Sequence, residues 1–410
     1  MVQHFDAIVV GAGPAGSATA ILLARAGWAV ALIEKQRFPR RKVCGECIAA
    51  SNLPLLDALG IGDAVEAGAG APLRQVSLLR GEASVTAELP AAGHPRHPWG
   101  RALGRETLDT LLLEQARAAG VAVMQPWAVQ TLCGRAGAWQ CELRSAESAA
   151  RRPLQASVLI DAHGSWEGLP WERAVRRRAR GGADLLAFKA NFLDSSLRDG
   201  VISVMALDGG YGGMVIGDRA VTTLACCIRR DRLGALRRAA PGTDVGGVVE
   251  AWLRGQCSGV RDALRHARRD GPWLSSGPLD PRLRIGADDG IFRVGNAAGE
   301  AHPILGEGMS MALQSAALLA VQLLGNRPAG AVPAGDLQAE LQRRYANEWR
   351  REFLPRMRLA AGFAQLAMRP RCAAAFFALA GAWPGILTRG ARWGGKVRLP
   401  GSMALPLRGA

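Results

Sequence analysis

A glycine-rich loop between two apolar runs constrains the fold of this chain more than any other stretch. Residues 5–34 read FDAIVVGAGPAGSATAILLARAGWAVALIE. The run Ala7–Val10 predicts a buried parallel strand, and Ala29–Ile33 predicts a second one. The Ala- and Leu-rich segment between them predicts a helix that ends at Gly27. Strand, helix and strand together form one βαβ unit, and an acidic residue, Glu34, follows the second strand.

The spacing of the glycines within this unit predicts a site for an adenine dinucleotide. Gly11, Gly13 and Gly16 form a G-x-G-x-x-G pattern directly after the first strand. Gly11 makes the tight turn, Gly13 lets a pyrophosphate approach the backbone, and Gly16 lets the helix pack on the strand. The helix N-terminus faces the phosphates with unpaired N–H groups, and Glu34 accepts hydrogen bonds from a ribose.

Length and charge limit the class of protein and of partner. The chain has 410 residues, enough for two or three domains, and 49% of them are hydrophobic. Its formal net charge is +16, with one dense run at Arg173–Arg180. This charge favours anionic substrates or an acidic carrier protein as partner. Nucleic acid is not expected, because aromatic residues do not alternate with the basic run.

The sequence predicts a cytoplasmic protein. No basic segment followed by an apolar segment opens the chain, so we expect no secretory signal. Eight cysteines are scattered, and Cys226 and Cys227 are adjacent, which is unlike a disulfide framework. No run of 18 purely apolar residues occurs, so no membrane-spanning helix is expected.

The rest of the chain contains further segments with helical and with strand-like patterns. Helices are predicted at Ser51–Leu59, Leu103–Gly120, Asp244–Arg254 and Gly259–Arg268, from about Gly308 to Leu324, and through most of Ala334–Ala410. Strands are predicted within Pro72–Leu89, at Val121–Met124, in a hairpin around Ala138–Arg144, and at Ala156–Ile160 and Ile291–Val294. Four further strands at Leu185–Phe192, Val201–Ala206, Gly210–Ile216 and Val221–Ile228 predict an antiparallel sheet.

Three separated segments together resemble one enzyme superfamily. They are the N-terminal loop, the strand that runs into Asp161-Ala-His-Gly164, and the element Gly295–Met309. This combination is similar to the FAD-dependent aromatic hydroxylases and geranylgeranyl reductases, and flavin-dependent halogenases share the scaffold. The resemblance implies an α/β fold. Its parts would be a Rossmann-like FAD domain, an inserted antiparallel β-rich substrate domain and a helical C-terminal region.

The resemblance also implies the division of the chain. The FAD domain would comprise residues 1–75, 101–170 and 283–330. The substrate domain would comprise residues 76–100 and 171–282, and residues 331–410 would form the helical C-terminal region.

The resemblance assigns FAD contacts residue by residue. Arg105 matches an arginine that opens a helix and contacts the phosphate region, and Asp161 and Gly164 match a second dinucleotide motif. Gly295 and Asn296 match a Gly-Asp pair whose carboxylate binds the ribityl chain, so the acid is replaced by an amide here. An amide still accepts and donates hydrogen bonds to a ribityl hydroxyl. The remaining implied contacts, including the loop beside the isoalloxazine ring, are Gly11, Gly13, Ala15, Gly16, Glu34, Lys35, Pro303, Gly306, Gly308 and Met309.

A helix that starts near Gly308 would place its positive end at the flavin ring and stabilise the anionic reduced form. The sheet Ala187–Ile228 resembles the domain that covers the reactive face of the flavin, with Tyr211 and Gly212 as substrate contacts. The candidate catalytic residues are Cys44, His302 and Glu307.

The pair Cys44-Gly-Glu-Cys47 leaves two interpretations open, a redox dithiol or a thiol that lines the flavin pocket. No second C-x-x-C occurs, so no metal site is expected. Halogenases carry a Trp-x-Trp-x-Ile-Pro signature, and Trp166–Trp171 has the wrong order and spacing for it.

The reaction that we favour is hydroxylation of an apolar aromatic or polyketide-like small molecule by an FAD-dependent monooxygenase, of the kind used in secondary metabolism. NAD(P)H would reduce the flavin, and O₂ would supply the oxygen. The alternatives are an alkene reductase with Cys44 as proton donor, a flavin-dependent halogenase, and a flavin-binding redox sensor without turnover. The uncharged run Cys372–Thr388 predicts either a helix packed on the substrate domain, or an apolar lid that admits a lipid-like or polyketide substrate or contacts a membrane surface.

Overall fold

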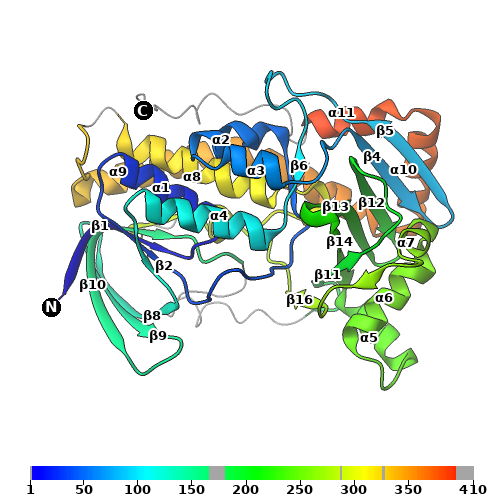
Figure 1. Ribbon diagram of the computed structural model, residues 1–410, viewed down its shortest axis with the longest axis horizontal. Coiled ribbons are helices and arrows are strands. Elements are labelled where there is room, and N and C mark those ends of the chain that lie inside the picture. The colour runs from blue at the N-terminus through cyan, green and yellow to red at the C-terminus, as the bar shows by residue number, and fades with distance from the viewer. Residues whose placement is uncertain (1, 166–180, 287–288, 326–327, 394–410) are drawn as a thin grey trace.

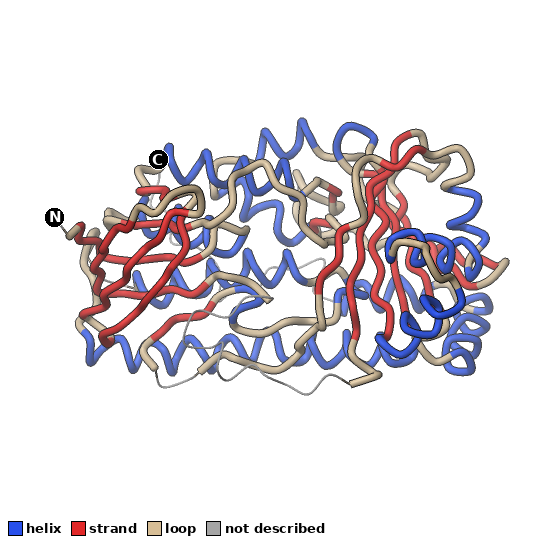
Figure 2. Tube along the Cα trace, turned by 90° about the horizontal axis from the view of Figure 1, so that it is seen from below, coloured by secondary structure: helices blue, strands red, loops and turns tan. Residues whose placement is uncertain are grey.

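Two β-sheets lie at opposite ends of the molecule, and helices fill the space between and around them (Figures 1 and 2). This computed structural model describes residues 2–165, 181–286, 289–325 and 328–393. The Arg173–Arg180 run and the Trp166–Trp171 segment lie outside the described residues.

The first sheet is the Rossmann-type sheet predicted from the N-terminal unit. Its parallel strands follow the order β7-β2-β1-β10, with β17 also parallel to β10, and the hairpin β8–β9 extends β10 on the antiparallel side. Ala7 and Val9 pack with the helices, and Ile8 and Val10 pack with residues of the hairpin, so the predicted burial of Ala7–Val10 is confirmed. The bounds are β1 Gln3–Val10, β2 Val30–Ile33, β7 Ala122–Met124, β8 Trp127–Arg135, β9 Ala138–Ser145, β10 Arg151–Asp161 and β17 Ile291–Arg293.

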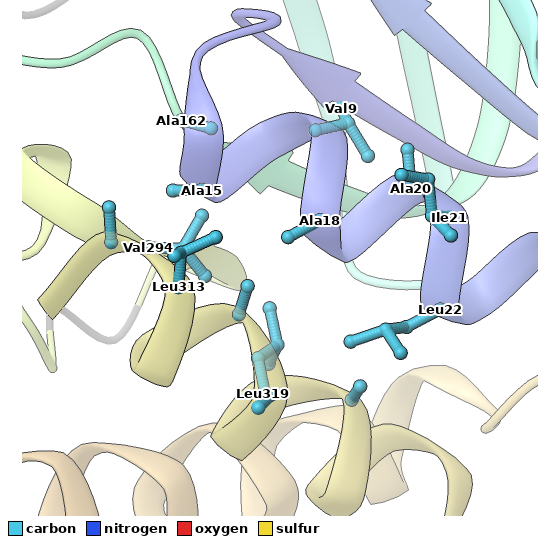
Figure 3. Packing of buried hydrophobic residues seen from close by; sticks show 14 of the residues in the cluster. Val9, Ala15, Ala18, Ala20, Ile21, Leu22, Ala162, Val294, Leu313 and Leu319 are labelled. Carbon is cyan, nitrogen blue, oxygen red and sulfur yellow. The ribbon is translucent and has the colours of Figure 1, made fainter. Parts of the chain in front are cut away.

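Packed helices cover one face of this sheet. Small residues let α1 and α8 approach closely: Figure 3 shows Ala15, Ala18 and Leu22 of α1 above Leu313 and Leu319 of α8. Gly27 follows the end of α1 with a positive φ of 89°, as its predicted role at the helix end requires. The helices on this side are α1 Pro14–Arg25, α2 Leu53–Ala58, α3 Gly62–Gly68, α4 Arg105–Ala118 and α8 Gly308–Leu324.

The second sheet contains the four predicted antiparallel strands in the order β11-β14-β13-β12, and each neighbouring pair is antiparallel. The hairpin β4–β5 extends this sheet beyond β12, and β4 runs parallel to β12. Parallel pairing is possible here because a long stretch of chain connects the two strands. Two short strands, β15 and β16, pair with β11. The bounds are β4 Gln75–Arg80, β5 Ala83–Glu88, β11 Leu185–Leu193, β12 Val201–Leu207, β13 Gly210–Ile216, β14 Thr222–Arg229, β15 Arg268–Arg269 and β16 Leu274–Ser276.

One face of the second sheet packs on three helices, α5 Arg230–Ala239, α6 Val245–Gln256 and α7 Ser258–Ala263. The sequence prediction missed α5, because this arginine-rich helix buries only Leu233 and so shows little apolar periodicity. The prediction of a helix over Gly259–Arg268 was too long. The chain leaves the helix after Ala263 and pairs with β11 at β15.

The C-terminal part is helical, as predicted, through its described residues. The long helix α9, Gly335–Ala367, packs on α8 and reaches β12 and β13, so it connects the two ends of the molecule. Two apolar helices follow, α10 Pro370–Ala382 and α11 Gly385–Trp393, and both contact β5. A two-stranded pairing of β3 Cys47–Ile48 with β6 Arg101–Ala102 lies between the two sheets.

Candidate functional site

The glycine-rich turn between β1 and α1 has the geometry of a phosphate cradle. Gly11 has a φ of 104°, and a Cβ there would lie 2.5 Å from the carbonyl oxygen of Ala162. A Cβ on Gly16 would lie 1.8 Å from the carbonyl oxygen of Gly11, so helix and turn meet only because both are glycines. A Cβ on Gly13 would meet only the Arg105 guanidinium, at 3.7 Å, and would otherwise enter the cavity.

The N-terminus of α1 is open to an anion. Gly13 is its N-cap, no side chain caps it, and the first turn contains no acidic residue. The Glu34 carboxylate lies beside the turn, where it accepts hydrogen bonds from the backbone N–H groups of Ala12 at 3.1 Å and Gln36 at 2.9 Å. Glu34 is buried but lines the cavity, as its predicted ribose contact requires.

Three cations converge on the same turn. Arg105 begins α4 and forms a bidentate ion pair with the buried Asp109, with distances of 2.7 and 2.8 Å. Burial alone would lower the pKa of Arg105, but Asp109 raises it above its usual value, so this guanidinium stays charged. Arg40 and Lys42 lie on the loop after β2 and line the cavity.

The charged form of Lys42 is disfavoured in this cluster. Burial, together with the charges of Arg40 and Arg105, lowers the pKa of Lys42 to about 8. Burial also lowers the pKa of Arg40, although Asp109 and Glu34 oppose the effect. Such a group of cations, with too little negative charge around it, is suited to bind a pyrophosphate.

The end of β10 carries the second predicted dinucleotide element. Asp161 is fully buried and accepts hydrogen bonds from the backbone and the ring Nδ1 of His163. Burial would raise the pKa of Asp161, but His163 and Arg293 lower it below its usual value. Asp161 therefore shapes the turn and does not line the cavity, whereas Gly164 does.

A chain of polar side chains faces the cavity beyond this turn. Asn296 donates a hydrogen bond of 2.6 Å from Nδ2 to the Ser165 hydroxyl, and Ser165 bonds in turn to the Glu300 carboxylate. Glu300 also accepts the backbone N–H of Asp280 at 3.0 Å. Burial raises the pKa of Glu300, so this carboxyl holds a proton more tightly than usual.

The loop before α8 reaches the cavity with its backbone. Pro303, Gly306, Gly308 and Met309 all line it, and Gly306 adopts a left-handed φ of 65°. A Cβ on Gly308 would meet no atom within 4 Å, so the N-terminus of α8 opens directly into the space.

Glu307, at the N-cap of α8, points elsewhere. Its carboxylate pairs with Arg356 of α9, and it does not line the cavity. The predicted acid at this position therefore serves to fasten α8 to α9.

One continuous cavity of about 570 Å³ connects these features with the second sheet. At its far end the lining is apolar and comes from β4, the residue after β5, β12 and the C-terminal helices. The apolar residues there are Val76, Leu78, Leu89, Ile202, Val204, Phe363, Leu366, Phe376, Phe377, Ile386 and Leu387.

Tyr211 of β13 lies where the polar and apolar parts of the cavity meet. It is 2% exposed, lines the cavity with Gly212, and its hydroxyl lies 3.4 Å from Nδ1 of His302. Burial raises the pKa of Tyr211 well above its usual value, and burial lowers that of His302. His302 is not among the cavity-lining residues and contacts the site through Tyr211.

The loop Cys44–Cys47 joins the two sheets at the cavity. Cys44 and Cys47 both line it, and neither forms a disulfide among the described residues. Between them the buried Glu46 accepts hydrogen bonds from the backbone N–H of Arg105 at 2.9 Å, from Lys189 of β11 and from Thr223 of β14. Glu46 therefore holds the thiols in place between α4 and the second sheet.

Most of the predicted site residues meet in this cavity, although they come from five separate stretches of sequence. Gly16, Asp161, His302 and Glu307 are the predicted residues that do not line it. The predicted residues that line it are Gly11, Gly13, Ala15, Glu34, Lys35, Cys44, Arg105, Gly164, Tyr211, Gly212, Gly295, Asn296, Pro303, Gly306, Gly308 and Met309.

Sequence reasoning did not assign a role to several residues that line the cavity. Arg40 and Lys42 belong to a dense basic stretch directly after β2, and this clustering was a usable signal. Trp127 and Val129, which lie near the Glu34 end of the first sheet, carried no such signal, because their strand is half-exposed and irregular in pattern.

Comparison with known proteins agrees with this geometry. Residues 4–192 match the FAD binding domain family. The matched segment contains the glycine-rich turn, the basic loop, Arg105 and Asp161. The predicted resemblance to FAD-dependent hydroxylases, halogenases and reductases is therefore confirmed.

The proteins that this chain resembles have different functions. Conditioned medium factor receptor 1 of Dictyostelium discoideum is 25% identical over 369 residues, which cover 85% of this chain and 68% of that protein. Menaquinone reductase of Mycobacterium tuberculosis is 49% identical over 57 residues, 14% of each chain. A flavin-dependent brominase structure matches with a TM-score of 0.73 and 16% identity over 97% of this chain and 95% of its own, which establishes a shared fold.

The described residues include no single helix that is long and apolar enough to cross a membrane, although α10 and α11 together meet the length and composition requirement. Among the same residues, no group of three or more His, Cys, Asp or Glu side chains has the arrangement of a metal site.

Proposed function

We propose that this protein is an FAD-dependent monooxygenase that hydroxylates an apolar, aromatic or polyketide-like small molecule. The observation that supports this most is the continuity of the cavity. It runs from the glycine-rich turn of α1 to a chamber walled by Phe376, Phe377 and aliphatic side chains. An apolar pocket with a few convergent polar groups is typical of a site for a small apolar ligand.

The residues present fit FAD. Gly13 leaves space at the uncapped N-terminus of α1, and Arg40, Lys42 and Arg105 would hold the pyrophosphate. Glu34 would accept hydrogen bonds from the adenosine ribose, and Asn296 would contact the ribityl chain. When bound, FAD supplies electron transfer from NAD(P)H and the activation of O₂.

The side chains of this chain would then bind, orient and shield the substrate. The apolar walls exclude water from the reacting centre, which protects reactive oxygen species from unproductive decay. Glu300, whose carboxyl lines the cavity, would orient a polar group of the substrate through a hydrogen bond. Tyr211, held by His302, would set the distance between the substrate and the second sheet.

A second candidate is supported by the position of Cys44. Its thiol lines the cavity beside the Arg105 guanidinium, which hydrogen-bonds it. In an alkene reductase this thiol would give a proton to one carbon of the substrate double bond, and reduced FAD would supply a hydride to the other carbon. The halogenase alternative is supported only by the shared fold. The alternative of a redox sensor without turnover is supported only by Asn296, which replaces the expected acid.

Anaerobic reduction with NADH and with NADPH, followed by oxygen and product analysis on phenolic and lipid panels, tests the first proposal. We expect substrate-dependent NAD(P)H oxidation with one O₂ consumed per product. If a double bond disappears without O₂ uptake, the reductase is correct. If FAD binds but no substrate stimulates oxidation, the sensor is correct.

Cys44→Ser and Cys47→Ser separate the candidates further. A general acid contributes about 10²–10⁴-fold, so a reductase loses turnover sharply in Cys44→Ser alone. A redox dithiol loses activity in both variants. A monooxygenase with normal O₂ coupling in both variants excludes the reductase and the dithiol together.

We also propose a partner and a cellular location for this protein. A net charge of +16 favours a substrate delivered by an acidic carrier protein, and the protein would act in the cytoplasm. The residue divisions of the FAD domain, the substrate domain and the C-terminal region remain those proposed from the sequence.

A further inference from the structure

The C-terminal helices α10 and α11 have an unusual distribution of apolar side chains. A surface helix normally carries polar residues on its outer face. Residues 372–388 contain no charged residue, and α10 buries only Ala373 and Ala380. The helix therefore exposes apolar surface away from the protein.

The two faces of this helix pair have different surroundings. Inward, Phe376, Phe377 and Leu387 line the apolar end of the cavity. Outward, Leu379 is 48% exposed and Trp383 is 45% exposed, and these are two of the six exposed large hydrophobic residues of the described chain. The apolar patch on the surface is thus separated from the cavity by a single layer of helix.

Four arginines lie on or beside the two helices that carry the exposed patch. Arg369 is the N-cap of α10, Arg371 lies in its first turn, and Arg389 and Arg392 lie on α11; all four are exposed. The Arg389 guanidinium lies over the Trp383 ring, 4.5 Å from its centroid. From Phe353 to the end of the chain the sequence contains no Asp or Glu, but nine Lys and Arg residues.

We propose that α10 and α11 dock on an anionic lipid surface. Leu379 and Trp383 would enter the boundary between headgroups and acyl chains, while the flanking arginines bind lipid phosphates. The two helices meet at a bend of 108°, and in this proposal they lie in the interface as a corner. An apolar substrate would then pass from the membrane into the cavity beneath these helices.

Charge distinguishes lipid from the other occupants of such a patch. A second copy of this chain would bring one set of arginines against another, which is repulsive. An acidic carrier protein would satisfy the arginines but would leave the exposed Leu379 and Trp383 without a matching apolar surface. An anionic membrane satisfies both features at once.

Flotation of the FAD-loaded full chain with vesicles tests this proposal. We expect binding to vesicles of phosphatidylglycerol and phosphatidylcholine, weaker binding at high salt, and little binding to phosphatidylcholine alone. Leu379→Ser with Trp383→Ser should lower the partition coefficient at least about tenfold. Arg371→Gln with Arg392→Gln should lower it about fivefold per arginine.

Matched controls come from other surfaces of the same chain. Leu337→Ser removes an equally exposed leucine from the start of α9, and Arg237→Gln with Arg238→Gln removes two exposed arginines from α5. Both controls should bind vesicles like the unmodified protein. Flavin content, measured by absorbance, shows that each variant is folded and tests the FAD assignment separately.

Two results would overturn the docking proposal. One is undiminished vesicle binding by the Leu379 and Trp383 variant. The other is binding to an acidic acyl carrier protein, but not to anionic vesicles, by the unmodified chain. Neither result bears on whether the protein oxidises or reduces its substrate.

Discussion

Asn296 and Ser165 are joined by a hydrogen bond of 2.6 Å from the amide Nδ2 to the hydroxyl oxygen. The amide is the donor, so the Ser165 proton is left for Glu300. A carboxylate at position 296 could only accept, and it would compete with Glu300 for that single proton. With an amide at position 296, the Ser165 hydroxyl accepts a hydrogen bond from Asn296 and donates its own proton to Glu300 without competition.

Asn296→Asp should keep FAD bound, because a carboxylate still accepts hydrogen bonds from ribityl hydroxyls. The added negative charge should lower the flavin reduction potential and raise the pKa of Glu300 further. A spectroelectrochemical titration measures the potential, and flavin absorbance measures the binding. A folded variant that has lost FAD would show that the donor function of the amide is required.

Gly13→Glu should abolish FAD binding, because its side chain enters the pyrophosphate space and adds a like charge. Gly234→Glu is the matched control, since a Cβ there lies 3.5 Å from the Arg238 guanidinium and the new carboxylate can pair with it. Both variants replace a glycine by glutamate, so a difference in flavin stoichiometry after purification reports only the effect of the position. A yellow Gly13→Glu protein with full flavin content would refute the dinucleotide site.

Lys42 predicts a pH dependence of FAD affinity. Without a ligand, its pKa is lowered from 10.5 to about 8, so near pH 8 about half of the ammonium groups have lost their proton. A bound pyrophosphate stabilises the cation and raises this pKa, so binding takes up a proton at alkaline pH. The dissociation constant should be flat well below pH 8 and increase as the pH rises through and above pH 8, by at most about tenfold per pH unit for one proton.

Lys42→Arg provides the control for this titration, because arginine stays charged throughout the range. Its FAD affinity should show no such change between pH 8 and pH 10. Lys42→Gln should bind FAD more weakly below pH 8 and also lose the dependence. Fluorescence titration of the apoprotein gives the constants, and an unchanged alkaline slope in Lys42→Arg would assign the effect to another group.

Glu46→Gln should destabilise the fold by leaving the buried Lys189 ammonium without its charge partner. Lys189 is 1% exposed, and removal of one member of a buried pair typically costs about 3–5 kcal/mol. Urea unfolding of the apoprotein measures the loss of unfolding free energy.

The double variant Glu46→Gln with Lys189→Met should recover part of this stability, because no charge then remains buried. If the double variant is no more stable than Glu46→Gln, the cost comes from the lost bonds to Thr223 and the Arg105 backbone. In either case the position of the Cys44 loop should be affected, which a thiol-reactivity rate would detect.

The sequence alone determined the parts of the fold that depend on local pattern. The unit Gly11–Glu34 follows from glycine spacing and apolar periodicity, and these signals are local, because a tight turn and an amphipathic helix need only neighbouring residues. The strands of the second sheet follow for the same reason. Helix α5 was missed because its exposed, arginine-rich sequence has almost no apolar face.

Only the tertiary structure decided which predicted side chains reach the cavity. Glu307 and Gly308 are adjacent in sequence, yet Gly308 opens into the cavity while Glu307 pairs with Arg356 of the distant α9. His302 likewise contacts the site only through Tyr211. The direction of a side chain depends on the elements that pack around it, and no local pattern records those contacts. The depressed pKa of Lys42 and the apolar chamber under α10 arise in the same way, from residues brought together by packing across the whole chain.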